Sequence, residues 1–484
     1  MPRLLKRKRS LTVAARFVTA RFVTARFVTT IAALHLSVLG LPAADLLIRN
    51  VTVVDVATGA RLLKRSILIH DDKIAAVGVD PEPPKDAAIV DGTGRFAIPG
   101  LWDMHVHLWY NENLFPMYLA YGVTGLRDMG SDLGRVNQWR REITSGKLLG
   151  PRIETCGSAV DGFPSTDPKL PVVVVRTAAE ARQTYDRLDS QNVDFIEVLA
   201  TLPREAYFAL VERARKYYSP VAGYIPGSVS VMEAIDARQK SIEHMSGILM
   251  ACSSDEAKLS KQHALAIERK DWAGAAELES RAMASYSARK AEELFERMAR
   301  FETRQVPTLV MLRRTAYLDA EKLAADTNLA YIPAAIRKSW GDVREDKNKL
   351  SQDSLDFMRV EYEKLAGTLK AMRHAGVQVM AGTDTGNAYT FPGIDLHREL
   401  ELLVEAGFTP LEALRSATVE PAAFLGTKDL GAIAPGKLAD LVLLDADPLK
   451  DIRNTQKISA VFVGGQYLSR AKLHGMLAGL KVHR

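Results

Sequence analysis

Short apolar segments alternate with longer helical stretches through most of the chain. Each apolar segment between about residue 100 and residue 424 ends at or near a polar residue, and a helical pattern follows it. This alternation is what a parallel sheet with helical crossovers requires. Eight strands are predicted, at residues 100–107, 122–128, 151–156, 193–198, 219–224, 240–244, 306–311 and 377–384. The predicted fold class is therefore α/β, a TIM-like (β/α)8 barrel with its chemistry at the carboxyl ends of the strands.

The two ends of the chain share a different pattern, of short β-branched strands broken by Gly and Asp turns. The runs DLLIRNVTVVDVATG and SILIHDDKIAAVG show it after Asp45, and GAIAPGKLADLVLLDADP and KISAVFVGGQYL show it near the carboxyl end. Strand residues and turn residues in this arrangement are typical of antiparallel sheets. We therefore expect residues 45–97 and 425–484 to form one small β-sandwich beside a barrel at residues 98–424.

A helical insertion in the barrel is predicted at about residues 254–302, which are rich in Ala, Glu, Lys and Arg. A second helical stretch follows at about residues 319–374. Solvated helical faces explain most of these charges. A lid over the barrel mouth and a contact between the subunits of a homo-oligomer are the alternative roles.

The basic residues are concentrated at the amino terminus. The chain has 64 Lys and Arg and 58 Asp and Glu, and eight of the basic residues precede Asp45, the first acidic residue. Without those eight, 56 basic residues face 58 acidic ones. The body of the protein therefore lacks the excess positive charge that would favour nucleic-acid binding.

Residues 1–44 have the pattern of a signal peptide, with a basic start, an apolar run at 31–41 and small residues at Ala43 and Ala44. The alternative is a retained membrane anchor, but the apolar run is shorter than the roughly 20 residues that span a bilayer. We expect a secreted or periplasmic protein with no membrane span after processing. Cys156 and Cys252 are too few for a disulfide scaffold, and the sequence does not decide whether they pair.

Several predicted strands end in residues that bind metals. His105 and His107 lie two apart on the first strand, so their side chains project from the same face. His244 ends the sixth predicted strand and Asp384 the eighth. Taken alone, His244 is equally explained as a buried core histidine, and Asp384 as a cap. Imidazole is the commonest zinc ligand. Three histidines and one aspartate at strand ends therefore favour a metal centre.

Longer motifs resemble those of one enzyme family. They are IPGLWDMHVHL, GVTGLRDMG, SIEHMSG, AGTDTG, LHRELELLVEAGFTPLEALRSATVEPAAFLG and LGAIAPGKLADLVLLDADP. In this order they resemble the imidazolonepropionase-like branch of the amidohydrolase superfamily, over nearly all of the chain from Asp45 to Leu468. Within that branch the chain is most similar to secreted dipeptidases of the Xaa-Pro type and to ochratoxin-degrading amide hydrolases.

The resemblance implies two metal ions bridged by a carboxylated lysine of the fourth strand, with one histidine each from the fifth and sixth strands. This sequence has Glu197 where the lysine is expected, and Tyr224 where the fifth-strand histidine is expected. A glutamate is the same kind of bridge as a lysine carbamate, whereas a phenol with a pKa of about 10 binds metal well only as phenolate. We therefore expect one zinc or similar divalent ion per chain, and a second ion weak or absent near His244 and Tyr224. The ligands expected for the first ion are His105, His107, Glu197 and Asp384.

Other residues would complete a hydrolytic site. We expect Asp384 to take a proton from the attacking water and to pass it to the leaving nitrogen. His244 or Tyr224 would polarise the substrate carbonyl. Arg127, at the end of the second predicted strand, and His397, beyond the eighth, are candidates for binding substrate. A salt bridge or a helix cap explains each of those two equally well.

The expected function is hydrolysis of an amide C–N bond in a dipeptide or an N-acyl amino acid by metal-activated water, a substrate class that the resemblance supplies. Residue spacing does not distinguish such a substrate from a cyclic amide or an imidazolone, so a cyclic amidohydrolase is the enzymatic alternative. A degenerate homologue that acts as a binding protein is the third reading, because losing a metal ligand commonly costs orders of magnitude in activity or affinity. The expected partner is a small molecule, not nucleic acid.

Overall fold

The computed structural model describes residues 45–79, 82–110, 112–318, 323–347 and 349–482. The expected signal peptide at 1–44 lies outside the described residues. Among the helices in the described ranges, none is long and apolar enough to cross a membrane.

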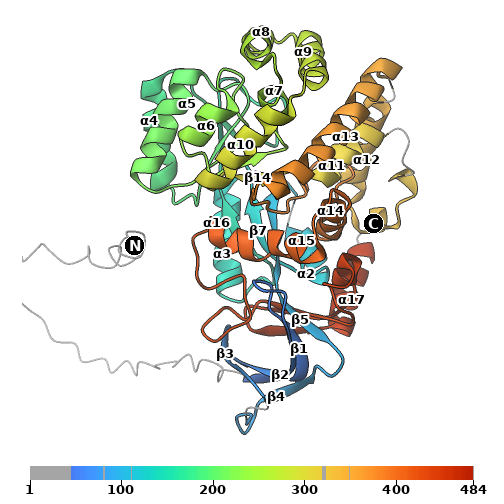
Figure 1. Ribbon diagram of the computed structural model, residues 1–484. Helices are drawn as coiled ribbons and strands as arrows, with labels where there is room; N and C mark the ends of the chain where they lie inside the picture. Colours follow the sequence, from blue (N-terminus) through green and yellow to red (C-terminus); the bar gives the residue numbers. More distant parts are fainter. Residues whose placement is uncertain (1–44, 80–81, 111, 319–322, 348, 483–484) are drawn as a thin grey trace, which may run out of the picture. The chain divides into compact units, whose positions relative to one another are not determined.

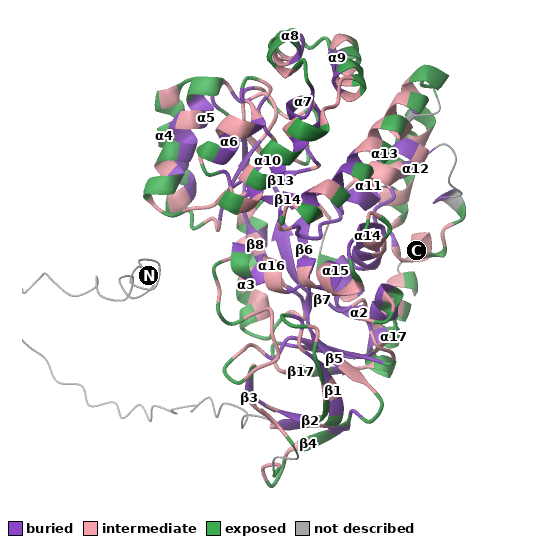
Figure 2. Cartoon of the chain, in the orientation of Figure 1, coloured by how far each residue is buried: buried purple, intermediate pink, exposed green. Residues whose placement is uncertain are grey.

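Parallel strands form the barrel (Figure 1). Their bounds are β6 (Leu101–Val106), β7 (Val123–Asp128), β8 (Arg152–Thr155), β11 (Ile196–Val198), β12 (Val221–Gly223), β13 (Ser241–Glu243) and β14 (Arg304–Val306). The first six lie inside the segments predicted as strands. A short pair, β9 (Ala159–Asp161) and β10 (Val172–Val174), adds to the edge of β11. Figure 2 shows the barrel strands buried and the surrounding helices buried on one side only.

The seventh strand begins earlier than predicted. β14 ends at Val306, and helix α11 (Leu309–Tyr317) occupies part of the predicted strand at 306–311. Thr308 has a left-handed backbone with φ 49°, which turns the chain between the two elements. Glu399 then accepts hydrogen bonds from the first two N–H groups of the helix, at 3.0 and 2.8 Å. A short apolar run does not distinguish a buried strand from a buried helix, and this prediction was wrong beyond Val306.

The eighth segment, 377–384, closes the barrel without forming a regular strand. Val379 makes an isolated parallel bridge to β14, and Asp384 N–H donates to His105 O of β6 at 2.8 Å. Gly382 permits this close approach, since a Cβ atom there would lie 2.8 Å from the Cβ atom of His105. The two ends of the barrel sheet therefore meet beside the first-strand histidines.

Helices follow most of the strands and pack around the barrel (Figure 1). Besides α11, their bounds are α2 (Phe115–Ala120), α3 (Leu133–Thr144), α4 (Ala178–Ser190), α5 (Arg204–Lys216), α6 (Val231–Asp236), α7 (Ile248–Ala251), α8 (Glu256–Glu268), α9 (Trp272–Ala284), α10 (Ala288–Phe301), α12 (Ala334–Lys347), α13 (Gln352–His374), α14 (Ile394–Glu405), α15 (Pro410–Ser416), α16 (Val419–Phe424) and α17 (Arg470–Val482). The predicted insertion at 254–302 forms α8, α9 and α10. The second helical stretch, 319–374, contains α12 and α13.

The two ends of the chain meet in one eight-stranded sheet, in the order β17-β16-β15-β5-β1-β2-β3 with β4 paired to β1. Its strands are β1 (Leu46–Val54), β2 (Arg61–His70), β3 (Lys73–Gly78), β4 (Ala88–Asp91), β5 (Phe96–Pro99), β15 (Leu441–Leu444), β16 (Ile458–Val463) and β17 (Gln466–Ser469). Residues from both ends, such as Ile48, Ile67 and Leu443, are fully buried in one shared core. The expected sandwich is thus a single hydrogen-bonded sheet that surrounds its own core.

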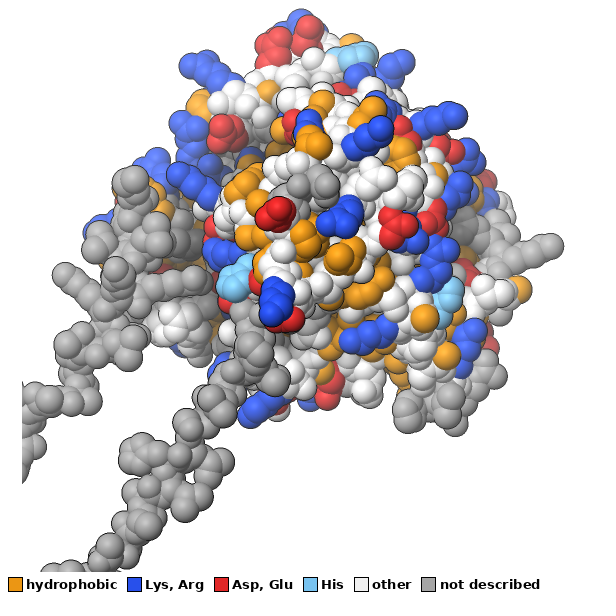
Figure 3. All heavy atoms as spheres, turned by 90° about the horizontal axis from the view of Figure 1, so that it is seen from below, with side chains coloured by type: hydrophobic (Ala, Val, Ile, Leu, Met, Phe, Trp, Pro, Cys, Tyr) orange, Lys and Arg blue, Asp and Glu red, His pale blue; other side chains and the backbone are white. Residues whose placement is uncertain are grey.

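The terminal sheet is joined to the barrel by a shared apolar core, to which Ile98 and Val442 of the sheet contribute, and by polar contacts. Arg152 of β8 donates to Asp440, just before β15, at 2.6 Å. Leu63 and Ile89 of the sheet, and Val79 directly after β3, are exposed apolar residues. Figure 3 shows Lys and Arg side chains interspersed with Asp and Glu over this end of the molecule, which fits the nearly balanced charge of the body.

Candidate active site

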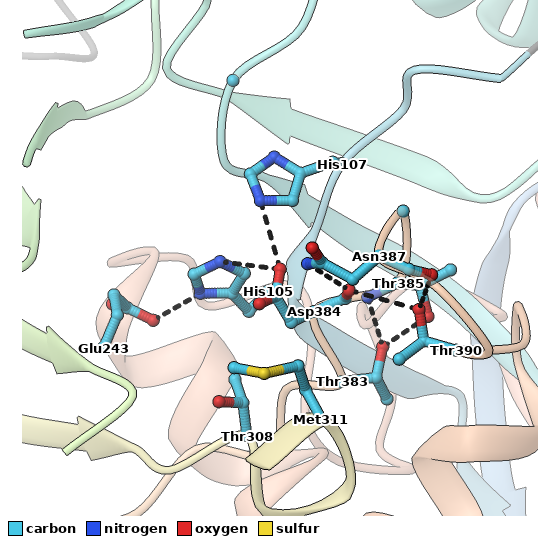
Figure 4. A network of polar contacts seen from close by, with 12 residues as sticks. His105, His107, Glu243, Thr308, Met311, Thr383, Asp384, Thr385, Asn387 and Thr390 are labelled. Carbon is cyan, nitrogen blue, oxygen red and sulfur yellow. Dashed lines mark hydrogen bonds and ion pairs between the residues drawn. The ribbon is translucent and has the colours of Figure 1, made fainter. Parts of the chain in front are cut away.

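Three side chains from two segments converge at the carboxyl end of the barrel strands (Figure 4). His105 and His107 stand at the end of β6, and Asp384 lies at the end of the eighth segment beside them. One candidate ligand atom from each residue lies within 4.8 Å of the other two. Asp384 Oδ1 is 3.1 Å from His107 Nε2 and 3.5 Å from His105 Nε2. The structure therefore brings together three of the four residues predicted to hold the first ion.

The backbone around Asp384 turns its carboxylate toward the histidines. Asp384 has a left-handed conformation with φ 58°, which Asp and Asn adopt more readily than other residues with a Cβ atom. The preceding Thr383 donates its N–H and Oγ1 to Asp103 at 3.0 and 2.6 Å, which anchors the segment on β6. The run AGTDTG therefore positions one carboxylate through small neighbours, a local turn and a side-chain anchor.

The cluster has the properties of a cation site. Asp384 and His107 are 5% and 8% exposed, and Asp384 Oδ1 and His107 Nδ1 are buried without a hydrogen-bond partner in the described part of the chain. Buried polar atoms are seldom left in this way unless an ion or ligand satisfies them. Burial would raise the pKa of Asp384, but the neighbouring histidines hold that pKa well below its usual range. Two imidazole nitrogens and a carboxylate oxygen are donors that zinc accepts, so these residues fit a divalent metal ion.

Other buried carboxyl groups surround this cluster. Burial raises the pKa of Asp103 to about 7, and it also raises the pKa of Asp128. Both groups are hydrogen-bonded to threonines, and Asp128 also accepts from Ser131 Oγ at 2.5 Å. Burying several carboxyl groups together is unfavourable unless positive charge offsets it. A divalent ion held by the cluster would supply that charge.

Glu243, which sequence reasoning did not identify, contacts one of the candidate ligands. It directly precedes His244 in the motif SIEH, and its position in that motif is the only signal the sequence offers. Glu243 Oε2 lies 2.9 Å from His105 Nδ1 and 2.8 Å from Arg127 Nη2. Burial would raise the pKa of Glu243, but the charge of Arg127 and the contact with His105 lower it to about 2. Glu243 is therefore ionised at neutral pH.

Glu197, the fourth predicted ligand, lies outside the three-residue cluster. It is 2% exposed, and its Oε2 accepts a hydrogen bond from the Cys156 thiol at 3.3 Å. Burial raises the pKa of Glu197 to about 8, although the charge of His107 opposes this shift. Cys156 and Cys252 are both buried, free thiols. The fourth ligand of the predicted set is thus near the site but not within ligand distance of the other three.

His244 and Tyr224 border the cluster. The His244 ring lies 4.5 Å from the His105 ring and 5.0 Å from the Tyr224 ring, centroid to centroid. His244 Nδ1 contacts Thr308 Oγ1 at 2.8 Å and lies 3.8 Å from Asp384 Oδ2. Burial lowers the pKa of His244 to about 4 and raises the pKa of Tyr224 above its ordinary value. At neutral pH, the imidazole is therefore uncharged and the phenol keeps its proton.

A cavity of about 280 Å³ extends from Tyr224 and His244 toward the helical insertion. Much of its wall is apolar, with Ile225, Leu249 and Leu365 among its residues. The insertion and α13 add the polar residues Glu256, Ser260, His263, Glu279 and Glu361. Helices of the insertion therefore line the space next to the candidate site, as a lid would.

Two predicted substrate-binding residues have protein partners instead. Arg127 is 0% exposed, and its guanidinium donates to a backbone carbonyl and to side chains of β13. His397 is 1% exposed, with Nδ1 2.9 Å from Thr455 Oγ1 and Nε2 2.9 Å from the carbonyl oxygen of Tyr121. Their polar atoms are already paired inside the fold, so the structure does not support direct contact with substrate for either residue.

The barrel, its strand-end cluster and the sheet formed from both chain ends define the class as a TIM-like barrel with a candidate metal centre and an appended β-domain. The amidohydrolase family pattern matches residues 96–468, and the chain belongs to this family. The predicted family and the α/β fold class are confirmed. Membership in this family supports hydrolysis of amide bonds in general.

Three individual relatives have low sequence identity to this chain, between 21% and 23%. Ochratoxinase from Aspergillus niger is 23% identical over 469 residues, which span 83% of this chain and 82% of that protein. Among solved structures, a bottromycin amidohydrolase has a TM-score of 0.71 at 21% identity over 90% of each chain. A Xaa-Pro dipeptidase with bound methionine has a TM-score of 0.63 at 22% identity, over 88% of this chain and 100% of that one. At this identity the solved structures establish the fold.

Proposed function

We propose that the protein hydrolyses an amide C–N bond in a dipeptide or an N-acyl amino acid, with one divalent metal ion, zinc by preference, held by His105, His107 and Asp384. The observation that carries the proposal is the buried meeting of two imidazole nitrogens with Asp384 Oδ1, which lies 3.1 Å from His107 Nε2 and 3.5 Å from His105 Nε2. An ion bound there would activate water and polarise a carbonyl as a Lewis acid.

The residues around the cluster would perform the proton transfers. Asp384, whose Oδ2 lies 3.8 Å from His244 Nδ1, would take a proton from the attacking water and pass it to the leaving nitrogen. Because Thr308 engages His244 Nδ1, the other ring nitrogen is left to face a substrate carbonyl. The Tyr224 phenol, protonated at neutral pH, can donate a hydrogen bond to the same oxygen.

The cavity beside the site supports a small substrate. Its volume of about 280 Å³ and its apolar wall fit an amino acid side chain or acyl group better than a long peptide. The names of a bottromycin amidohydrolase and a Xaa-Pro dipeptidase among the structural neighbours agree with an amide substrate. Glu197 lies outside the cluster, and its Oε2 accepts a hydrogen bond from the Cys156 thiol, so it is not one of the proposed ligands.

The test is metal analysis combined with an amidase assay. We expect one tightly bound ion per chain and hydrolysis of N-acyl amino acids or Xaa-Pro dipeptides that chelator abolishes and zinc restores. His107→Asn should lose both metal and activity. His397→Asn, which alters a buried histidine outside the cluster that bonds to Thr455 and to the Tyr121 carbonyl, should keep both. Absence of metal and turnover would refute the proposal in favour of a binding protein, and activity on cyclic amides alone would favour the cyclic amidohydrolase. Two ions in the unaltered protein would contradict the single-ion assignment.

We also propose that residues 1–44 direct export of the chain, on the basis of their basic start and apolar run. Cell fractionation should find the full-length chain outside the cytoplasm and a chain lacking these residues inside it. Equal retention of both in the cytoplasm would contradict export.

A further inference from the structure

A buried ion pair behind His105 has no role in the proton transfers described above. Arg127 Nη2 donates to both carboxylate oxygens of Glu243, at 2.9 and 2.8 Å, and both side chains are 0% exposed. Ser241 Oγ donates to Glu243 Oε1 at 2.5 Å. The remaining contact of Glu243 is with His105 Nδ1 at 2.9 Å, which Figure 4 shows on the side of the imidazole away from His107.

Arg127 is held rigidly where it can neutralise Glu243. Its Nε donates to the Met104 carbonyl oxygen at 2.5 Å, and its Nη1 donates to Ser241 Oγ at 3.0 Å. The guanidinium lies over the rings of Phe195 and Phe424, 5.5 and 4.8 Å from their centroids. These contacts exclude water from the pair and give the guanidinium a single orientation.

Such a pair is a costly way to stabilise a fold, because the desolvation of two charges offsets much of their attraction. Its specific effect is on the imidazole. A carboxylate is only an acceptor, so the neutral His105 ring must carry its proton on Nδ1 to complete this contact. The lone pair of Nε2 then points at the site where His107 and Asp384 meet, 3.5 Å from Asp384 Oδ1.

We propose that Glu243, paired with Arg127, is a positioning residue that fixes the tautomer and the ring orientation of His105 and thereby sets the affinity of the site for a divalent cation. This inference rests on the proposed function, since it assumes that His105 is a metal ligand. A carboxylate that contacts the outer ring nitrogen of a metal-bound histidine acts through that histidine. Loss of such a contact typically weakens metal binding by about 10–100-fold.

The test compares zinc affinity in two matched variants. Glu243→Gln keeps the size of the side chain and removes its charge. Glu399→Gln makes the same substitution at another fully buried carboxyl, which caps α11 and lies outside the three-residue cluster. Zinc dissociation constants are measured by chelator competition on protein whose folding is checked by circular dichroism. We expect about 10–100-fold weaker binding for Glu243→Gln and an unchanged constant for Glu399→Gln. A merely structural role would lower the melting temperature of Glu243→Gln without changing the zinc affinity of the folded protein.

A second measurement needs no change at Glu243, and it decides the question if Glu243→Gln fails to fold. Nitrogen-15 NMR of histidine-labelled, zinc-free protein reports the tautomer, with the His105 signals identified by their loss in His105→Gln. We expect the neutral form of the ring to carry its proton on Nδ1. A neutral ring with its proton on Nε2, or zinc affinity in Glu243→Gln within twofold of the unaltered protein, would overturn the inference and leave the proposed function standing. If the unaltered protein binds no zinc, both fall together.

Discussion

Replacing Asp384 by asparagine is the most direct test of the proposed centre. Asparagine has the same shape and tolerates the left-handed backbone at this position, so the fold should persist. The change removes the negative charge that lies 3.1 Å from His107 Nε2 and 3.5 Å from His105 Nε2. It also removes the proposed proton acceptor. Both effects act on the same reaction, so the loss should be large.

The expected magnitudes follow from linkage and from acid–base catalysis. At a zinc concentration of about 100 times Kd, binding stabilises the native state by about 2.7 kcal/mol. For a chain of 484 residues this corresponds to a rise in Tm of about 3 °C. Asp384→Asn should lose most of that rise. Its kcat/KM should fall by at least about 10³, or about 4 kcal/mol of transition-state stabilisation.

Differential scanning fluorimetry with zinc and with chelator measures the first quantity, and initial rates on an N-acyl amino acid measure the second. Asp395→Asn is the matched control, because Asp395 is also buried but pairs with Arg314 at 2.6 Å. It should lower Tm in both conditions and keep the zinc-induced rise. If Asp384→Asn kept the full rise and an activity within tenfold of the unaltered protein, Asp384 would be neither a ligand nor a base.

Three further outcomes are expected. Tyr224→Phe removes the proposed hydrogen bond to the carbonyl and should lower kcat by about 10²–10³ at unchanged zinc content, so an unchanged kcat would exclude that role. The double variant Glu197→Lys, Tyr224→His restores the ligand types that the family resemblance implies and should raise the metal stoichiometry toward two, as metal analysis would show. Burial lowers the pKa of His397 from 6.5 to about 4. As the pH falls, the unfolded chain therefore takes up a proton before the folded chain does. The stability that His397 contributes above pH 6.5 is lost as the pH falls toward 4. In chelator, urea unfolding of His397→Asn should show a shallower fall over that range, and an equal slope would contradict the assignment.

Local patterns were sufficient for much of the fold. The first six barrel strands lie inside the segments that alternation of apolar and helical stretches predicts, and the two chain ends share one sheet as their common strand pattern indicates. These features depend on periodicity and turn residues that lie close together in the chain. The prediction of the seventh strand failed because it used only the short apolar run. The hydrogen bonds from Glu399 that start the helix after the turn at Thr308 come from a distant part of the chain.

The sequence by itself determined the family and the three groups that meet at the site. His105 and His107 share a strand face, and the small residues of AGTDTG let Asp384 approach that strand closely. Only the tertiary structure decided which other polar residues join them. Glu243 contacts His105, while Arg127 and His397 have their hydrogen-bond partners inside the fold. The physical reason is that a hydrogen bond requires a distance and a direction, and for residues more than a hundred positions apart both are set by the packing of the whole barrel.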